Sequence, residues 1–165
     1  MKARQWIDFL KMEAHPEGGY YKSSFTSTDS LEFAAHGGER PLYTSIYFLL
    51  RTQDISHFHR LKSDELWYYH AGSALTVHII DEKGQYRQEK LGIGIAEGEK
   101  PQVSVKKGSI FGSTVDREDS FSLVGCMVAP GFDFEDFELF TQRQLLAEYP
   151  EHHEAIKRLA YVEIP

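Results

Sequence analysis

The chain has 165 residues, of which 41% are hydrophobic and 13% aromatic, enough for one domain with a sizeable buried core. Its formal net charge is −7, and its lysines and arginines are scattered, which disfavours nucleic acid or an anionic membrane surface as the main partner. No apolar run is long enough to cross a bilayer, and the first residues lack the unbroken apolar stretch of a signal peptide. Cys126 is the only cysteine, and we expect a cytoplasmic protein in which this thiol is a small buried hydrophobe.

The first predicted element is a short amphipathic helix over residues 4–12, where apolar side chains recur at helical spacing. The segment HPEGGYY (residues 15–21) ends this helix, because it contains a proline and two adjacent glycines. From Tyr20 to about residue 140 the apolar residues alternate instead, as in β-strands. The runs that predict strands are 43–50, 65–70, 75–80, 86–91, 101–105 and 121–128. Strands at this spacing, without helices between them, indicate an antiparallel sandwich or barrel.

The C-terminal part of the chain is predicted to be helical again. Thr141 and Gln144 form a T-x-x-Q capping pattern, and Pro150 is placed to open a second helix. No repeat, low-complexity segment or linker divides the sequence. We therefore expect a single domain over residues 1–165, with the barrel at about 20–140 and the C-terminal helices at 141–160.

The segment HFHRLKSDELWYYHAG (residues 57–72) carries the most informative pattern. His57 and His59 are two residues apart, so they would share one face of a strand. If the following RLKSD is the hairpin turn, Glu65 begins the returning strand beside them. Two imidazoles and a carboxylate that converge from neighbouring strands form the facial arrangement that holds non-haem iron and similar divalent ions.

This segment resembles the first sequence motif of the cupin superfamily. In that motif an H-x-H pair is followed by a glutamate and, after six further residues, by a glycine. His57, His59, Glu65 and Gly72 match this motif, with one residue more than usual between the second histidine and the glutamate. Together with HPEGGYY and with SLVGCMVAPGFDFEDFEL further along, the segment resembles cupin family five, a group of small proteins of unknown function. This resemblance covers roughly residues 5 to 140.

What the resemblance implies is a mainly β fold. It is the cupin-type double-stranded β-helix, an RmlC-like jelly-roll barrel similar to sugar-nucleotide epimerases, here with short N-terminal and C-terminal helices. The resemblance also implies a homodimer, and the aromatic-rich segment YYKSSF (residues 20–25) could cross to a partner sheet. It brings no established substrate.

The sequence departs from a complete cupin metal site, in which a second motif supplies a further histidine. Phe111, within KKGSIFGST, stands where that histidine would fall. A divalent ion would then be held weakly by His57, His59 and Glu65 with water, or with a borrowed ligand such as His78. Two alternatives are open: a metal-free pocket that uses the same residues as hydrogen-bonding groups, and a purely structural role for both histidines.

Further candidate residues come from the flanking segments. The two glycines of HPEGGYY allow close backbone approach to a ligand or to another surface. The resemblance to cupin family five, whose pattern includes this segment, implies that the loop lies at the rim of the pocket, where His15, Glu17 and Tyr20 would meet a ligand. The simpler interpretation is a tight turn between helix and first strand. Tyr47 and Trp67 are expected to line the cavity.

The leading interpretation is a protein that binds a small polar, carbohydrate-like ligand in the barrel and acts as an epimerase or isomerase. Such a reaction needs a base that removes a carbon-bound proton, an acid, and a carboxylate that orients the base. By residue type and expected facing, the base is His57 or His59. The acid is Tyr69 or Tyr47, and the orienting carboxylate is Asp64 or Asp136. The alternatives are a metal-dependent oxygenase or isomerase at the predicted metal ligands, and a barrel that binds a metabolite without reaction. Asp136 lies in PGFDFEDFEL (residues 130–139), whose alternation of aromatic and acidic residues predicts a strand with one buried face.

Overall fold

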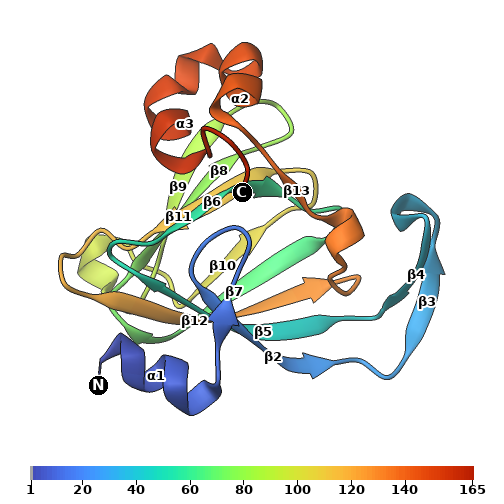
Figure 1. Ribbon diagram of the computed structural model, residues 1–165, viewed down its shortest axis with the longest axis horizontal. Helices are drawn as coiled ribbons and strands as arrows, with labels where there is room; N and C mark the ends of the chain where they lie inside the picture. The colour runs from blue at the N-terminus through green and yellow to red at the C-terminus, as the bar shows by residue number, and fades with distance from the viewer. Residues whose placement is uncertain (1) are drawn as a thin grey trace.

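A computed structural model describes residues 2–165 as two antiparallel sheets that face each other (Figure 1). The larger sheet has the strand order β1-β2-β5-β12-β7-β10, and the smaller sheet has the order β13-β6-β11-β8-β9. A separate hairpin, β3–β4, extends away from the barrel. This architecture, with short helices near both ends of the chain, is the predicted fold class.

The strands are β1 (Glu13–Ala14), β2 (Tyr20–Thr26), β3 (Ser30–Phe33), β4 (Gly38–Pro41), β5 (Thr44–Arg51), β6 (Ile55–Arg60), β7 (Asp64–Gly72), β8 (Leu75–Ile80), β9 (Tyr86–Leu91), β10 (Gln102–Val105), β11 (Ile110–Thr114), β12 (Phe121–Ala129) and β13 (Glu138–Leu139). The α-helices are α1 (Ala3–Leu10), α2 (Gln142–Glu148) and α3 (His153–Leu159). Short 3₁₀ helices are η1 (Ala34–His36), η2 (Ile95–Glu97), η3 (Phe134–Asp136) and η4 (Pro150–His152).

The period-two pattern located most of the barrel strands. β8 and β9 have the predicted bounds, and β5, β7, β10 and β12 differ from the predicted ranges by one or two residues at an end. The pattern does not predict β11, because every residue of Ile110–Thr114 is buried and the strand therefore shows no alternation. It also does not predict the β3–β4 hairpin, where three of the four β3 residues are exposed and β3 has no buried face that alternates with an exposed one.

The prediction of a strand over PGFDFEDFEL is wrong for most of that segment. Phe134–Asp136 forms the 3₁₀ helix η3, and only Glu138–Leu139 pairs as β13. The Asp133 side chain accepts a hydrogen bond from the Glu135 N–H at 2.9 Å and thereby caps the helical turn. Such a local bond from an aspartate competes with the strand ladder, and the alternation alone does not reveal it.

The helices cover the outer faces of the two sheets. Ile7 of α1 and Met12 just after it form a cluster with Leu49 and Leu123 of the larger sheet. The C-terminal helices α2 and α3 cover the smaller sheet, above the barrel in Figure 1. The predicted capping box at the start of α2 is confirmed, because Thr141 and Gln144 bond reciprocally. Within residues 2–165, no helix has the length and apolarity that a membrane crossing requires.

Candidate functional site

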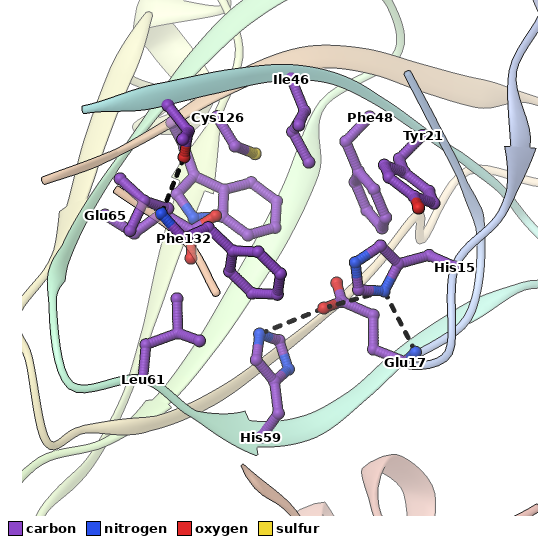
Figure 2. Close-up of a pocket in the computed structure, with 13 residues that line it drawn as sticks. His15, Glu17, Tyr21, Ile46, Phe48, His59, Leu61, Glu65, Cys126 and Phe132 are labelled. Carbon is purple, nitrogen blue, oxygen red and sulfur yellow. Dashed lines mark hydrogen bonds and ion pairs between the residues drawn. The ribbon is translucent and has the colours of Figure 1, made fainter. Parts of the chain in front are cut away.

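The barrel contains a cavity of about 50 Å³ whose wall combines aromatic rings with ionisable side chains (Figure 2). The ionisable residues are His15, Glu17, His59 and Glu65. The aromatic residues are Tyr21, Phe48, Trp67 and Phe132, and the rest of the wall consists of Thr44, Ile46, Leu61, Cys126 and Val128. An apolar hollow on which a few polar groups converge is the usual form of a small-molecule site.

The loop between β1 and β2 carries His15 and Glu17 into this cavity. Two backbone bonds close the loop, from the His15 N–H to the Gly19 oxygen at 3.0 Å and from the Gly18 N–H to the His15 oxygen at 2.9 Å. Gly18 has a φ of +114°, and a side chain there would overlap the Ile55 carbonyl of β6. The expectation that the glycines allow close backbone approach is therefore confirmed.

The Glu17 carboxyl group lies between the two cavity histidines (Figure 2). Its Oε1 accepts a hydrogen bond from Ser56 Oγ at 2.7 Å. Its Oε2 lies 3.3 Å from His59 Nε2 and 3.4 Å from His15 Nδ1. The Glu17 N–H already donates to His15 Nδ1 at 3.2 Å, so the contact with His59 is the one in which a proton can be shared.

Burial disfavours the charged form of both partners in this Glu17–His59 contact. His59 donates its Nδ1–H to the His57 carbonyl at 2.7 Å, which leaves an unprotonated Nε2 facing Glu17. Burial raises the pKa of Glu17, and burial lowers the pKa of His59 to about 4. Both shifts disfavour the charged forms, and Glu17 Oε2 and His59 Nε2 are placed to exchange one proton. Transfer of a proton between these two atoms leaves the net charge of the pair unchanged.

His57 does not line the cavity, contrary to the expectation that it shares a face with His59. Ser56 and His59 both reach the same carboxyl group, although they are three residues apart. The reason is a β-bulge, in which His57 and Phe58 of β6 stand opposite Gly112 alone on β11. A Cβ at Gly112 would lie 2.5 Å from the Ser56 oxygen, so the bulge requires a glycine on the neighbouring strand.

His57 instead holds the loop that carries Glu17. Its backbone N–H and its Nδ1–H both donate to the Glu17 carbonyl, at 2.8 and 2.7 Å. On its other side, its ring stacks on Tyr161 from the C-terminal segment. His57 is therefore a positioning residue here, and not a group that faces the cavity.

Glu65 enters the cavity from β7 with Trp67, two residues further along the same face. In the part of the chain that the structure describes, Glu65 Oε2 and Trp67 Nε1 are buried without a hydrogen-bond partner. Burial raises the pKa of Glu65 to about 8, the nearby Glu17 carboxyl group adds to this shift, and the Cys126 thiol opposes it. At neutral pH the Glu65 carboxyl group is therefore mostly protonated.

Several predicted residues lie outside the cavity. Tyr20 and Tyr47 pack in the cluster that joins α1 to the outer face of the larger sheet, because their neighbours Tyr21 and Phe48 take the inward positions. Tyr69 shares strand parity with Glu65 but is four residues further along β7, and its hydroxyl group donates to the Gly72 carbonyl at 2.6 Å.

Neither candidate orienting carboxylate reaches a cavity histidine. Asp136 lies on η3 and forms a buried ion pair with Arg40 at 2.8 Å. Asp64 accepts a hydrogen bond from the Lys107 N–H at 2.8 Å at the surface. The carboxyl group beside the cavity histidines is that of Glu17, which the sequence placed only at the rim.

The predicted metal ligands do not assemble into a site. His57 is turned away by the bulge, and His78 belongs to a separate buried network with Tyr86 and Thr114. Phe111 packs against the His59 ring, with centroids 4.2 Å apart. Among residues 2–165, no group of three or more His, Cys, Asp or Glu side chains is arranged to hold a metal ion. The donor set does not fit the facial arrangement that the sequence suggested.

Sequence reasoning missed Tyr21, Cys126 and Phe132 as cavity residues. Alternation shows that Tyr20 and Tyr21 face opposite ways, but both are aromatic, and the pattern does not say which one is inside. Cys126 is buried as expected, and its strand pairing with Trp67 places it beside the ionisable groups.

Comparison with known proteins gives one family and several close folds. The family model described as "Cupin superfamily (DUF985)" matches residues 4–140. The uncharacterised protein YML079W of Saccharomyces cerevisiae is 30% identical over 146 residues, which are 81% of this chain and 72% of the yeast protein. A protein of Shewanella oneidensis, SO0799, has a solved structure that is 50% identical, with a TM-score of 0.91 and 99% of each chain covered.

Two further solved structures extend the comparison. A hypothetical protein from Leishmania major is 43% identical, with a TM-score of 0.91 over 98% of this chain and 99% of the other. An oxalate decarboxylase of Bacillus subtilis is 16% identical, with a TM-score of 0.59. That match covers 96% of this chain but 39% of the enzyme, so it supports the barrel fold alone.

Proposed function

The chain belongs to the DUF985 family of the cupin superfamily, and we propose that its barrel binds a small polar ligand and moves protons on it as an isomerase. The observation that carries this proposal is the Glu17–His59 pair inside the cavity, at 3.3 Å between Oε2 and Nε2. Paired titratable groups whose environments shift their pKa values are typical of sites for acid–base chemistry.

The pair supports proton transfer through a relay. One Glu17 oxygen accepts the carbon-bound proton of the ligand while the other passes its own proton to His59 Nε2. The negative charge that develops on the ligand is then balanced by the imidazolium, whose Nδ1–H remains bonded to the His57 carbonyl. The hydroxyl proton of the ligand passes to the former carbonyl oxygen, and reversal of the relay then returns the carbon-bound proton at the neighbouring carbon, which completes an isomerisation with a single base.

This arrangement favours isomerisation over epimerisation. Epimerisation in the predicted form needs a tyrosine acid on the opposite face of the ligand, but Tyr69 and Tyr47 lie outside the cavity. Tyr21 lines the cavity but packs against His15, on the same side as Glu17. Glu65 and Trp67 remain as groups that bind the ligand through their unpartnered polar atoms. Phe48 and Trp67, whose ring centroids are 5.9 Å apart, provide apolar walls for the ligand.

The proposal is tested by deuterium incorporation. The protein is incubated in D₂O with a panel of small hydroxy-aldehydes and hydroxy-ketones, and NMR follows the loss of the carbon-bound proton. We expect exchange with the wild type, its loss in Glu17→Gln, and unchanged exchange in Glu138→Gln, whose carboxylate pairs with Arg60 at the exposed surface. Ligand binding without any exchange would instead support the non-catalytic metabolite-binding barrel.

A further inference from the structure

The cavity contains acidic groups without a matching cation. Glu17 and Glu65 both line it, each buried to more than 90%, and none of its lining residues in the described chain is a lysine or an arginine. The buried Arg40 is bound to Asp136 outside the cavity. A ligand that brings a negative charge would therefore meet two carboxyl groups and no basic partner, which is costly inside a protein.

Two buried polar atoms in the cavity wall lack partners. Glu65 Oε2 and Trp67 Nε1 project from the same face of β7, and the Trp67 side chain is almost fully buried. Trp67 Nε1 is only a donor, so it requires an acceptor such as a carbonyl or hydroxyl oxygen. Glu65 is satisfied in its charged form by a strong donor such as an ammonium group.

The aromatic side chains of the cavity wall also favour a positively charged ligand. The rings of Tyr21, Phe48 and Trp67 border the cavity, and the faces of such rings attract ammonium groups. The negative net charge of the whole chain, −7, also raises the local concentration of cations over anions.

We propose that the ligand of this cavity is a small amino-aldehyde or amino-ketone, whose ammonium group binds Glu65 and whose carbonyl oxygen accepts the Trp67 N–H, with an amino alcohol such as ethanolamine as its non-reacting analogue. This inference rests on the proposed function and names the chemical class of its ligand. The size agrees, because a cavity of about 50 Å³ has room for roughly three to five water-sized groups, as in an amino alcohol of four heavy atoms.

Binding of a cation is coupled to release of a proton. Glu65 holds a proton at neutral pH because its pKa is raised to about 8, and an ammonium group beside it stabilises the carboxylate. The other titratable groups that face the cavity are His15, Glu17, Tyr21, His59 and Cys126, and burial favours the neutral form of each. The displaced proton therefore passes to solvent and not to one of these neighbours.

The test uses three probes of similar size and different charge: ethanolamine, ethylene glycol and glycolate. Isothermal titration calorimetry at pH 7 in two buffers of different ionisation enthalpy gives both the affinity and the number of protons exchanged. We expect ethanolamine to bind most tightly and to release close to one proton for each molecule bound. In Glu65→Gln, its affinity should fall by at least about tenfold, as for loss of a charge-assisted bond, whereas Glu138→Gln should bind like the wild type.

Each other outcome overturns the inference. Preferential binding of ethylene glycol without proton exchange means a neutral ligand, and this leaves the proposed isomerase in place. Preferential binding of glycolate with proton uptake means an anionic ligand. If none of the probes binds while deuterium exchange occurs on a hydroxy-ketone, the ligand class is wrong and the proposed function stands. The proton count for the wild type decides the point even if Glu65→Gln does not fold.

Discussion

The ring of Tyr161 stacks on the imidazole of His57, with centroids 3.6 Å apart and an angle of 12° between the planes. The Tyr161 hydroxyl group also donates to the Pro16 carbonyl at 2.9 Å. His57 in turn donates hydrogen bonds to the Glu17 carbonyl from its backbone N–H and from its ring Nδ1–H. The segment after α3 therefore clamps the loop that brings Glu17 into the barrel, across 145 positions of sequence between Pro16 and Tyr161.

Replacement of Tyr161 by Leu should loosen this loop, because both the stacking and the hydroxyl bond are lost. We expect a loss of about 1–2 kcal/mol of unfolding free energy and faster amide hydrogen exchange at His57. Tyr161→Phe keeps the stacking and should have the smaller effect. Val162→Ala is the control, since that side chain is 73% exposed. Unchanged exchange at His57 in Tyr161→Leu would show that the loop is held by other contacts.

Gly18→Ala should destabilise the protein more than Gly37→Ala. Both glycines have positive φ values, +114° and +76°, but a Cβ at Gly18 would overlap the Ile55 carbonyl whereas a Cβ at Gly37 meets nothing within 4 Å. Gly37→Ala should cost about 1–2 kcal/mol from backbone strain alone, and Gly18→Ala more, because the loop must also shift. Urea denaturation of the two variants measures this difference, and equal losses would contradict it.

Glu65 should make stability fall as pH rises from 6.5 to 8. Its pKa is raised from 4.5 to about 8 in the folded protein, so in this range the folded state holds a proton that the unfolded state has released. The free energy of unfolding then decreases by about 1.4 kcal/mol for each pH unit, and the decrease ends above the folded pKa. Histidines whose pKa is lowered in the folded protein, such as His59, make stability rise with pH. This effect is confined to pH values below their unfolded pKa of 6.5.

The measurement compares wild type with Glu65→Gln by urea denaturation across this pH range. The variant lacks the Glu65 carboxyl group, so its stability should fall less steeply than that of the wild type, and the part that remains comes from other raised carboxyl groups such as Glu17. Parallel curves would mean that Glu65 is already ionised at neutral pH.

Metal binding should be absent or weak in the wild type and stronger in Phe111→His. Phe111 pairs with His59 across β6 and β11, which is where a cupin metal site would have its additional histidine. Affinity for divalent ions depends on the number of deprotonated ligands. Elemental analysis after dialysis against chelator tests this, with Phe111→Leu as the control for a changed core residue. One tightly held ion per chain in the wild type would contradict it.

The chain is predicted to form a homodimer. Phe25 and Tyr43 stack at 5.6 Å between ring centroids, yet they are 52% and 39% exposed, and Leu31 of the nearby hairpin is 58% exposed. A cluster of this kind gains free energy when a second copy covers it. Light scattering at micromolar concentration should give a dimer mass, and Phe25→Glu should shift it toward the monomer. A monomer mass for the wild type would remove the prediction.

The sequence by itself determined the fold class and most of the barrel. Alternation follows directly from the two faces of a strand, so β8 and β9 have their predicted bounds, and the T-x-x-Q pattern placed the start of α2. The same local rules identified His59, Glu65 and Trp67 as inward-facing residues. The prediction that Glu65 returns beside the histidines in one hairpin is wrong, because β6 and β7 belong to the two different sheets and face each other across the cavity.

Only the tertiary structure decided which groups meet. A one-residue bulge opposite Gly112 turns His57 away from His59, and strict period-two reasoning contains no such insertion. Glu17 becomes the partner of His59 because a loop 40 positions from His57 folds over the barrel and is held there by the C-terminal Tyr161. Contacts between segments so distant along the chain depend on how the sheets close, and the local periodicity of the sequence carries no information about that closure.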